Sequence, residues 1–225
     1  MKTVFLLGGS GGIGRAVARR FQKAGWRVIA PTRRELDLED RASIAQFFRK
    51  SAPRADALIH CAGWNRPGPA EAVTVEDLEK AMAVNVFGFF WVLRHLLPGM
   101  KRNKGGSVVA VSSLYGLFSR KNRLPYAASK HALNGLMRTL ALELGRHGIR
   151  VNLLSPGFVD TAMTRRNNDP AMIRKLCERV PLGRLARPSD IAQAVYFLCS
   201  PEGGYIHGAN LVVDGGYSIG GFQPE

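Results

Sequence analysis

Tyr126 and Lys130 lie four residues apart in the segment Tyr126-Ala127-Ala128-Ser129-Lys130, and Ser113 precedes the tyrosine by thirteen residues. Side chains at this spacing lie one above the other on a helix, which predicts a phenol beside an ammonium group. A neighbouring cation favours the phenolate and lowers the phenol pKa toward the range in which proton transfer is efficient. A serine hydroxyl at the end of a preceding strand can hold a carbonyl oxygen next to that phenol. The three residues therefore predict acid–base chemistry at a carbonyl group.

A glycine-rich segment, Gly8 to Gly14, follows a predicted strand at residues 3–7 and precedes a predicted helix at 15–23. Backbone N–H groups of such a turn and the N-terminus of the following helix attract phosphate. Gly9, Gly11 and Gly14 fit the general dinucleotide pattern G-x-G-x-x-G. A tight turn that only packs the helix on the strand is the alternative, but the context favours a dinucleotide cofactor.

Short apolar segments alternate with helical ones along the whole chain. Strands are predicted at 3–7, 27–30, 57–61, 107–111, 150–154 and 210–213, and helices at 15–23, 43–49, 75–97, 126–144 and 191–198, with Pro98-Gly99 ending the third helix. This alternation predicts a single α/β domain over residues 1–225, a Rossmann-type doubly wound parallel sheet flanked by helices. Residues 156–185 follow a strand's carboxyl end, where ligands bind in such sheets, and are the candidate substrate lid.

The chain is strongly basic, with 32 Lys+Arg against 17 Asp+Glu and a formal net charge of +15 over 225 residues. Such a charge attracts a dinucleotide or an acidic carrier protein. The basic residues are scattered and not interleaved with aromatics, so no nucleic-acid partner is expected. The longest apolar run, 87–93, is too short for a membrane span, and the three cysteines match no metal or disulfide pattern. We expect a cytoplasmic protein with no metal site and no membrane partner.

The tyrosine–lysine pair, the serine and the glycine segment resemble those of the short-chain dehydrogenase/reductase family, over nearly the whole chain. Gly8, Gly12 and Gly14 fit the family's G-x-x-x-G-x-G pattern as a second reading of the glycine segment. The closing segments 183–190 and 213–216 are most similar to bacterial 3-oxoacyl carrier-protein reductases. The resemblance implies an oxidoreductase that reduces a ketone to a secondary alcohol with NADP or NAD. It also implies a homotetramer, or a dimer, built on two of its helices.

The same resemblance assigns four catalytic positions. Asn85 matches the asparagine that holds a water for a proton relay, and Ser113 matches the serine that orients the substrate carbonyl. Tyr126 matches the general acid of reduction, and Lys130 matches the lysine that binds the nicotinamide ribose and lowers the tyrosine pKa. The family's cofactor contacts map onto Gly8, Ser10, Gly12, Ile13, Gly14, Ala62, Gly63, Tyr126, Lys130, Pro156, Gly157, Val159 and Thr161. Val159 would meet the nicotinamide carboxamide, and Thr161 the diphosphate.

The choice between NADP and NAD depends on the residues after the second strand. Thr32 stands where the family places the acid that selects NAD. Arg33 could bind the extra phosphate of NADP, assisted by Arg15 or Arg34. We therefore favour NADP(H), with NAD(H) as the alternative because Glu35 is near enough to compete. Asp37-Leu38 resemble the family's adenine-binding pair, but a parallel crossover needs a dozen or more residues. The family's third strand and the helix before it are therefore predicted to be shortened or missing.

His60-Cys61-Ala62-Gly63 replaces the family's Asn-Asn-Ala-Gly, and His60 and Cys61 are expected to be structural substitutes. The leading functional hypothesis is a reductase of a 3-oxoacyl group bound to an acyl carrier protein. A reductase or dehydrogenase of a small free ketone or alcohol is the second hypothesis. An NADP-binding sensor or scaffold is the non-enzymatic one, and the four intact catalytic positions argue against it.

Overall fold

The computed structural model describes residues 1–51 and 53–220. Six parallel strands form one sheet in the order β2-β1-β3-β4-β5-β6. The strands are β1 (Thr3–Leu7), β2 (Arg27–Ile29), β3 (Ala57–His60), β4 (Gly106–Val111), β5 (Ile149–Pro156) and β6 (Asn210–Val213). The chain winds outward from β1 to β2 and then returns to β3 on the other side of β1. This reversal confirms the doubly wound α/β fold.

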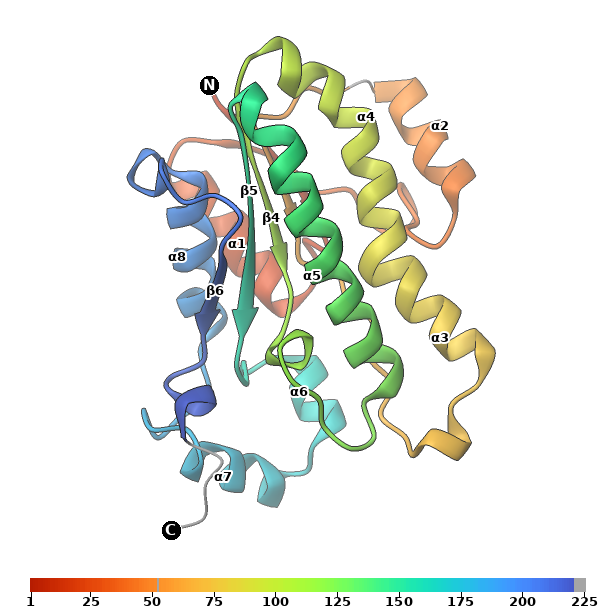
Figure 1. Cartoon of the computed structure of the whole chain (residues 1–225), viewed down its shortest axis with the longest axis vertical. Helices are drawn as coiled ribbons and strands as arrows, with labels where there is room; N and C mark the ends of the chain where they lie inside the picture. The colour runs from red at the N-terminus through yellow and green to blue at the C-terminus, as the bar shows by residue number, and fades with distance from the viewer. Residues whose placement is uncertain (52, 221–225) are drawn as a thin grey trace.

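Eight α-helices belong to the described part of the chain, and the larger ones cover the two faces of the sheet. They are α1 (Gly12–Lys23), α2 (Arg41–Ser51), α3 (Val75–Met82), α4 (Gly88–Arg102), α5 (Leu124–Leu144), α6 (Ala162–Asn167), α7 (Pro170–Glu178) and α8 (Pro188–Cys199). Figure 1 shows α4 and α5 along one face and α1 and α8 along the other. Successive residues of β1 divide between the two cores, because Phe5 packs with α4 and α5 while Leu6 packs with α1 and α8.

β2 is the edge of the sheet, as the shortened segment predicts. Residues 30–40 contain turns but no strand, and the chain passes from β2 directly to α2 and then to β3. The unit expected to be shortened or missing is therefore absent from this part of the described chain. Leu36, Ile44 and Phe48 are nevertheless buried against the rest of the core, so the short connection still covers the sheet.

One continuous helical region carries Asn85, and it ends later than predicted. A π-helical turn, Ala83–Phe87, joins α3 to α4, and such turns are frequent at functional sites. The predicted stop at Pro98-Gly99 is wrong, because α4 continues through Pro98 to Arg102. Burial of Met100 in the core favours this continuation over the hydrogen bond that the proline removes.

The same region, Val75–Arg102, is long and apolar enough by length and composition to cross a membrane. Nearly half of its most apolar window, 44%, is buried inside the fold. Its inner side includes Phe89, Val92 and Leu93, which pack in the core with α5 and α2. These contacts are those of a core helix that lies on a sheet.

The carboxyl ends of the strands meet at one edge, and the predicted site residues follow them there. Gly8 follows β1, Ala62 follows β3, Ser113 follows β4 and Gly157 follows β5. The helices α6 and α7 lie beyond this edge (Figure 1). They belong to the segment 156–185 that was predicted as a substrate lid, and that role stays a prediction.

Candidate active site

A cavity of about 420 Å³ opens at the carboxyl edge of the sheet. It is lined by all predicted cofactor contacts, namely Gly8, Ser10, Gly12, Ile13, Gly14, Arg33, Asp37, Leu38, Ala62, Gly63, Tyr126, Lys130, Pro156, Gly157, Val159 and Thr161. Ser113 lines it too, so three of the four predicted catalytic residues share this cavity. Asn85 is fully buried behind it and is not part of its wall.

The glycine turn contributes bare backbone to the wall of the cavity. Gly8 has a φ of +80°, and a Cβ on it would collide with the backbone nitrogen of Ala62 across the switch point of the sheet. A Cβ on Gly14 would collide with the carbonyl oxygen of Gly8. A Cβ on Gly11 would find room, at 3.4 Å from its nearest neighbour. Gly8 and Gly14 therefore require glycine, whereas Gly11 of the general pattern does not.

The same turn fits a dinucleotide diphosphate. Gly12 is the first residue of α1, so unpaired N–H groups of the helix N-terminus face the turn. A Cβ on Gly12 would lie 3.0 Å from Cγ2 of Thr161. The predicted diphosphate contact, which is the N-cap of α6, therefore lies directly across the turn. The donor groups and the bare backbone suit a phosphorylated cofactor.

Lys130 lies at the chemical end of the cavity, the part of its wall that also contains Ser113 and Tyr126. It lies on α5 one helical turn after Tyr126, and its Nζ lies 5.5 Å from the centre of the tyrosine ring. Nζ donates a hydrogen bond of 2.9 Å to the carbonyl oxygen of Val111 at the end of β4. Lys130 is 2% exposed, and this burial lowers its pKa from 10.5 to about 8.

Tyr126 behaves differently from the prediction. Desolvation of the phenol raises its pKa to about 12, while a hydrogen bond from Ser113 and the charge of Arg123 act in the opposite direction. The expectation of a tyrosine pKa lowered toward neutral pH is therefore wrong for this structure. Desolvation of the phenolate dominates, and Nζ of Lys130 is engaged by the carbonyl of Val111.

Asn85, in the π-turn, hydrogen-bonds both the loop after β3 and helix α5. Its Oδ1 accepts a hydrogen bond of 2.7 Å from the backbone nitrogen of Trp64, and its Nδ2 donates to the Trp64 carbonyl at 3.0 Å. The same Nδ2 donates to Oγ of Ser129 at 2.8 Å, and that hydroxyl donates to the carbonyl of Tyr126 at 2.8 Å. The amide therefore positions the turn of α5 that carries the tyrosine. Its predicted role in a water relay stays a prediction.

His60 supports the π-turn from β3. The ring lies 5.1 Å from that of Phe89, and Nε2 lies 3.2 Å from the carbonyl oxygen of Asn85. Burial, followed by the charge of Lys130, lowers the His60 pKa to about 3, so the neutral ring donates from Nε2 to that carbonyl. Burial also raises the Cys61 pKa to about 12, so its thiol is protonated at neutral pH. This geometry fits the expectation that both residues are structural substitutes.

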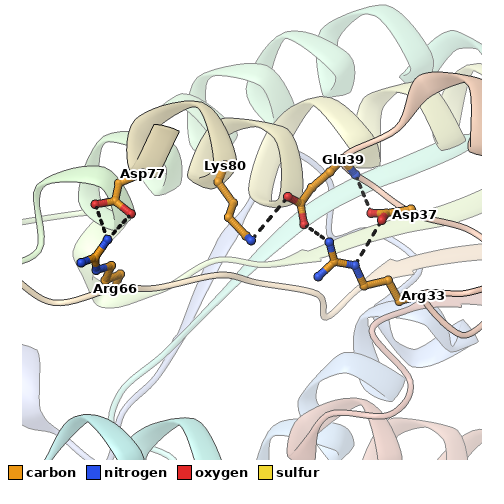
Figure 2. Close-up of polar contacts among 6 residues, drawn as sticks. All are labelled: Arg33, Asp37, Glu39, Arg66, Asp77 and Lys80. Carbon is orange, nitrogen blue, oxygen red and sulfur yellow. Dashed lines mark hydrogen bonds and ion pairs between the residues drawn. The ribbon is translucent and has the colours of Figure 1, made fainter. Parts of the chain in front are cut away.

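Acidic side chains surround Arg33 in the part of the cavity wall that follows β2. The adenosine of a dinucleotide is expected there, so we call this part the adenosine end. Nε of Arg33 lies 3.1 Å from Asp37 and its Nη2 lies 2.6 Å from Glu39, while Lys80 of α3 approaches the other oxygen of Glu39 at 3.6 Å (Figure 2). A separate pair, Arg66 with Asp77, lies further along α3 in Figure 2.

Glu35 is not the competitor that the sequence suggested. Its carboxylate accepts hydrogen bonds from the backbone nitrogen and the hydroxyl of Thr32, at 2.7 and 2.9 Å, and it does not line the cavity. Glu39 takes that place, because it both lines the cavity and pairs with Arg33.

Sequence reasoning missed part of the cavity wall near Tyr126. The additional residues there are Tyr115 and Arg123, which belong with Arg120 to the connection between Ser113 and Tyr126. Their position in the sequence could have identified them, because a short segment that connects two residues of one site must pass close to that site.

Comparisons with known proteins agree with this geometry. A family model described as "Enoyl-(Acyl carrier protein) reductase" matches residues 30–218. An oxidoreductase of the short-chain dehydrogenase/reductase family from Burkholderia thailandensis has a solved structure with a TM-score of 0.87 and 31% identity, covering 97% of this chain and 93% of that one. This chain belongs to the short-chain dehydrogenase/reductase family.

Two further members of this family are similar over almost their entire length. The 3-oxoacyl-[acyl-carrier-protein] reductase of Thermotoga maritima is 33% identical over 97% of this chain and 98% of the relative. A protein assigned as an NAD(P)-dependent gluconate 5-dehydrogenase, from Beutenbergia cavernae and with bound NADP, is 32% identical with a TM-score of 0.92. That comparison covers 97% of each chain. The present chain is therefore an oxidoreductase of a family that binds NAD(P).

Proposed function

We propose that this member of the family reduces a ketone to a secondary alcohol with NADP(H). The observation that carries the proposal is the arrangement of a single cavity. Its wall brings the bare glycine turn together with Ser113, Tyr126 and Lys130. Such a cavity can hold a dinucleotide along its length, with a carbonyl group beside the phenol.

The protein's own groups supply proton transfer and positioning. Tyr126, with its pKa raised to about 12, is protonated at neutral pH and can donate its proton to a carbonyl oxygen as that oxygen gains charge. Ser113 can hold the same oxygen by a hydrogen bond. Lys130 adds positive charge beside the phenol, and the resemblance to the family implies that it also binds the nicotinamide ribose. When bound, the nicotinamide supplies the hydride.

NADP(H) is the proposed cofactor because Arg33 lines the adenosine end and Thr32 leaves no acid at the position that selects NAD. NADP in the Beutenbergia cavernae neighbour supports the proposal. The pairing of Arg33 with Asp37 and Glu39 keeps NAD(H) as the alternative.

Two substrate classes are in competition. A 3-oxoacyl group on an acyl carrier protein is supported by the identity to the Thermotoga maritima reductase and by the net charge of +15. A small free ketone or alcohol is supported by the structural similarity to the gluconate 5-dehydrogenase.

We also propose a homotetramer, with a dimer as the alternative. The π-turn and α5 carry apolar side chains on the outer surface, with Phe87 49% and Leu142 87% exposed. Such side chains suit contacts with another copy. A cytoplasmic location, and the lack of nucleic-acid and membrane partners, stay predictions.

One experiment tests the proposal and separates the substrate classes. Purified protein is mixed with NADPH or NADH, and cofactor oxidation is followed with a carrier-bound 3-oxoacyl thioester, its N-acetylcysteamine analogue and a panel of free ketones. Faster turnover of the carrier-bound form, lost at high salt, supports the carrier protein. Tight NADPH binding without turnover of any carbonyl compound would instead support the sensor or scaffold hypothesis.

A further inference from the structure

Arg123 is a buried cation at the chemical end of the cavity. The residue is 9% exposed and lines the cavity. Its Nη1 reaches the carbonyl oxygen of Asn122 at 3.4 Å, and its guanidinium also hydrogen-bonds the Tyr115 side chain. Within residues 1–51 and 53–220, no carboxylate lies within ion-pair distance of it. A buried guanidinium that lacks an acidic partner is costly for the folded protein.

A second arginine lies at the same hydroxyl group. Nη1 of Arg120 donates to the Tyr115 hydroxyl at 3.3 Å, and Arg120 also lines the cavity. The tyrosine hydroxyl thus contacts two guanidinium groups. Desolvation, and then the charge of Arg120, lower the pKa of Arg123, which shows that the two cations repel each other. An anion between them would relieve both effects.

The two arginines belong to the substrate's part of the cavity. The Tyr115 ring lies 6.4 Å from the Tyr126 ring in an edge-to-face arrangement, and the charge of Arg123 acts directly on the Tyr126 phenol. The acidic residues of the cavity wall, Asp37 and Glu39, lie at the adenosine end with Arg33. The cofactor's phosphates have their own sites at the glycine turn and at Arg33, so they do not account for Arg120 and Arg123.

We propose that Arg123, assisted by Arg120 and Tyr115, binds a carboxylate of the substrate, so that the enzyme acts on a small oxo acid or the corresponding hydroxy acid. The proposal rests on the hydride transfer proposed above and selects the free substrate. A guanidinium binds a carboxylate through two parallel hydrogen bonds. A 3-oxoacyl thioester carries no charge close to its keto group, so it would leave this cation unpaired.

Pairs of acids and esters test the proposal. The kcat/KM with NADPH is measured for acetoacetate, levulinate and 4-oxocyclohexanecarboxylate, and for the methyl ester of each. We expect at least one acid to exceed its ester by roughly tenfold or more, because a charged hydrogen-bond pair is lost in the ester. If every ester is reduced as well as its acid, the carboxylate site is refuted while the ketone reductase stands. If no compound is reduced although NADPH binds, the proposed reduction itself fails.

Substitutions test whether the preference for acids over esters depends on Arg123. Arg123→Met should lower the acid-to-ester ratio of kcat/KM by roughly 10- to 100-fold, and Arg123→Lys should restore part of it. The matched control is Lys121→Met, which removes a charge from the same connection at an exposed position outside the cavity wall. That control should keep the ratio of the unmodified protein.

Folding and direct binding complete the test. If Arg123→Met does not fold, as judged by circular dichroism and NADPH binding, the more accessible Arg120→Met takes its place, with a smaller expected loss of the ratio. Calorimetry with levulinate gives a measurement independent of turnover. An unchanged acid-to-ester ratio in a folded Arg123→Met protein would refute the assignment.

Discussion

The two ends of the cavity are built in different ways. At the chemical end, Lys130 and Asn85 are buried, and their partners come from β4, from the loop after β3 and from α5. At the adenosine end, the Arg33 side chain is 66% exposed, and both acids that pair with it lie within six residues of it in the sequence. The first arrangement depends on the whole fold, whereas the second depends mainly on one short surface segment.

This difference has consequences for what each end tolerates. Removing one partner of a buried hydrogen bond leaves a desolvated polar group, which costs about 1–3 kcal/mol. An exposed ion pair contributes roughly 0–1 kcal/mol. Substitutions at the chemical end should therefore change both activity and stability. Substitutions at the adenosine end should change cofactor preference and leave stability almost unaltered.

The largest effect is expected at the phenol. Tyr126→Phe removes the proposed acid and the hydroxyl that hydrogen-bonds Ser113, so kcat should fall on the order of a thousandfold. NADPH binding, measured by fluorescence titration, should be retained. Tyr205→Phe, at a fully exposed tyrosine, is the control and should keep full activity. A Tyr126→Phe protein with ordinary turnover would show that another group donates the proton.

The chemical end was also the more predictable one from sequence. The positions of Tyr126 and Lys130 follow from the helix period, and Ser113 follows from the end of an apolar strand. The sequence could not show the surroundings that set the pKa values of Tyr126 and Lys130. Desolvation of Tyr126 and the bond from Lys130 to the Val111 carbonyl depend on tertiary packing, which local spacing does not encode.

The second effect concerns the buried ammonium. Lys130→Met should lower kcat/KM on the order of a hundredfold because the cation beside the phenol is lost. It should also stabilise the protein at pH 7. A shift of the Lys130 pKa from 10.5 to about 8 corresponds to about 3 kcal/mol of lost stability when the group is charged. The carbonyl of Val111, left without its donor, offsets about 1 kcal/mol of this gain.

The pH dependence of the free energy of unfolding tests whether the charged Lys130 destabilises the protein. Between pH 8 and 10.5 the unfolded protein binds more protons at Lys130 than the folded one, so this group makes the native protein more stable as pH rises. The advantage of Lys130→Met in urea unfolding should therefore shrink across that interval. A stability difference that is the same at pH 7 and pH 10 would contradict a buried, destabilised ammonium.

A third and smaller effect is expected at the adenosine end. Arg33→Met should raise the KM for NADPH roughly tenfold and leave the KM for NADH nearly unchanged, because only NADPH carries the phosphate that this guanidinium would bind. Arg34→Met is the matched control, since Arg34 is exposed and does not line the cavity. Equal changes for both cofactors would indicate that Arg33 only maintains the segment.

The adenosine end shows where sequence reasoning reached its limit. The missing strand and helix followed from counting residues between Arg33 and Asp37, because a crossover has a minimum length. The roles of Glu35 and Glu39 were not readable in the same way. Which carboxylate turns toward Arg33 depends on the hydrogen bonds that Glu35 makes with Thr32 and on the position of Lys80 on another helix.

The smallest effect should be a fall in the KM for NADPH, opposite to the rise expected for Arg33→Met. Glu39→Gln removes a charge that holds Arg33 at 2.6 Å and would compete with the phosphate of NADPH, so the KM for NADPH should fall roughly threefold. Stability should change by less than about 0.5 kcal/mol, since the pair is exposed. Asp190→Asn is the control for the KM, because it breaks a similar pair, with Arg184 at 2.7 Å, and neither of these residues lines the cavity. An unchanged KM for NADPH in Glu39→Gln, beside a clear loss in Arg33→Met, would mean that Glu39 does not restrain the guanidinium. The adenosine end would then be set by Arg33 and Asp37 alone.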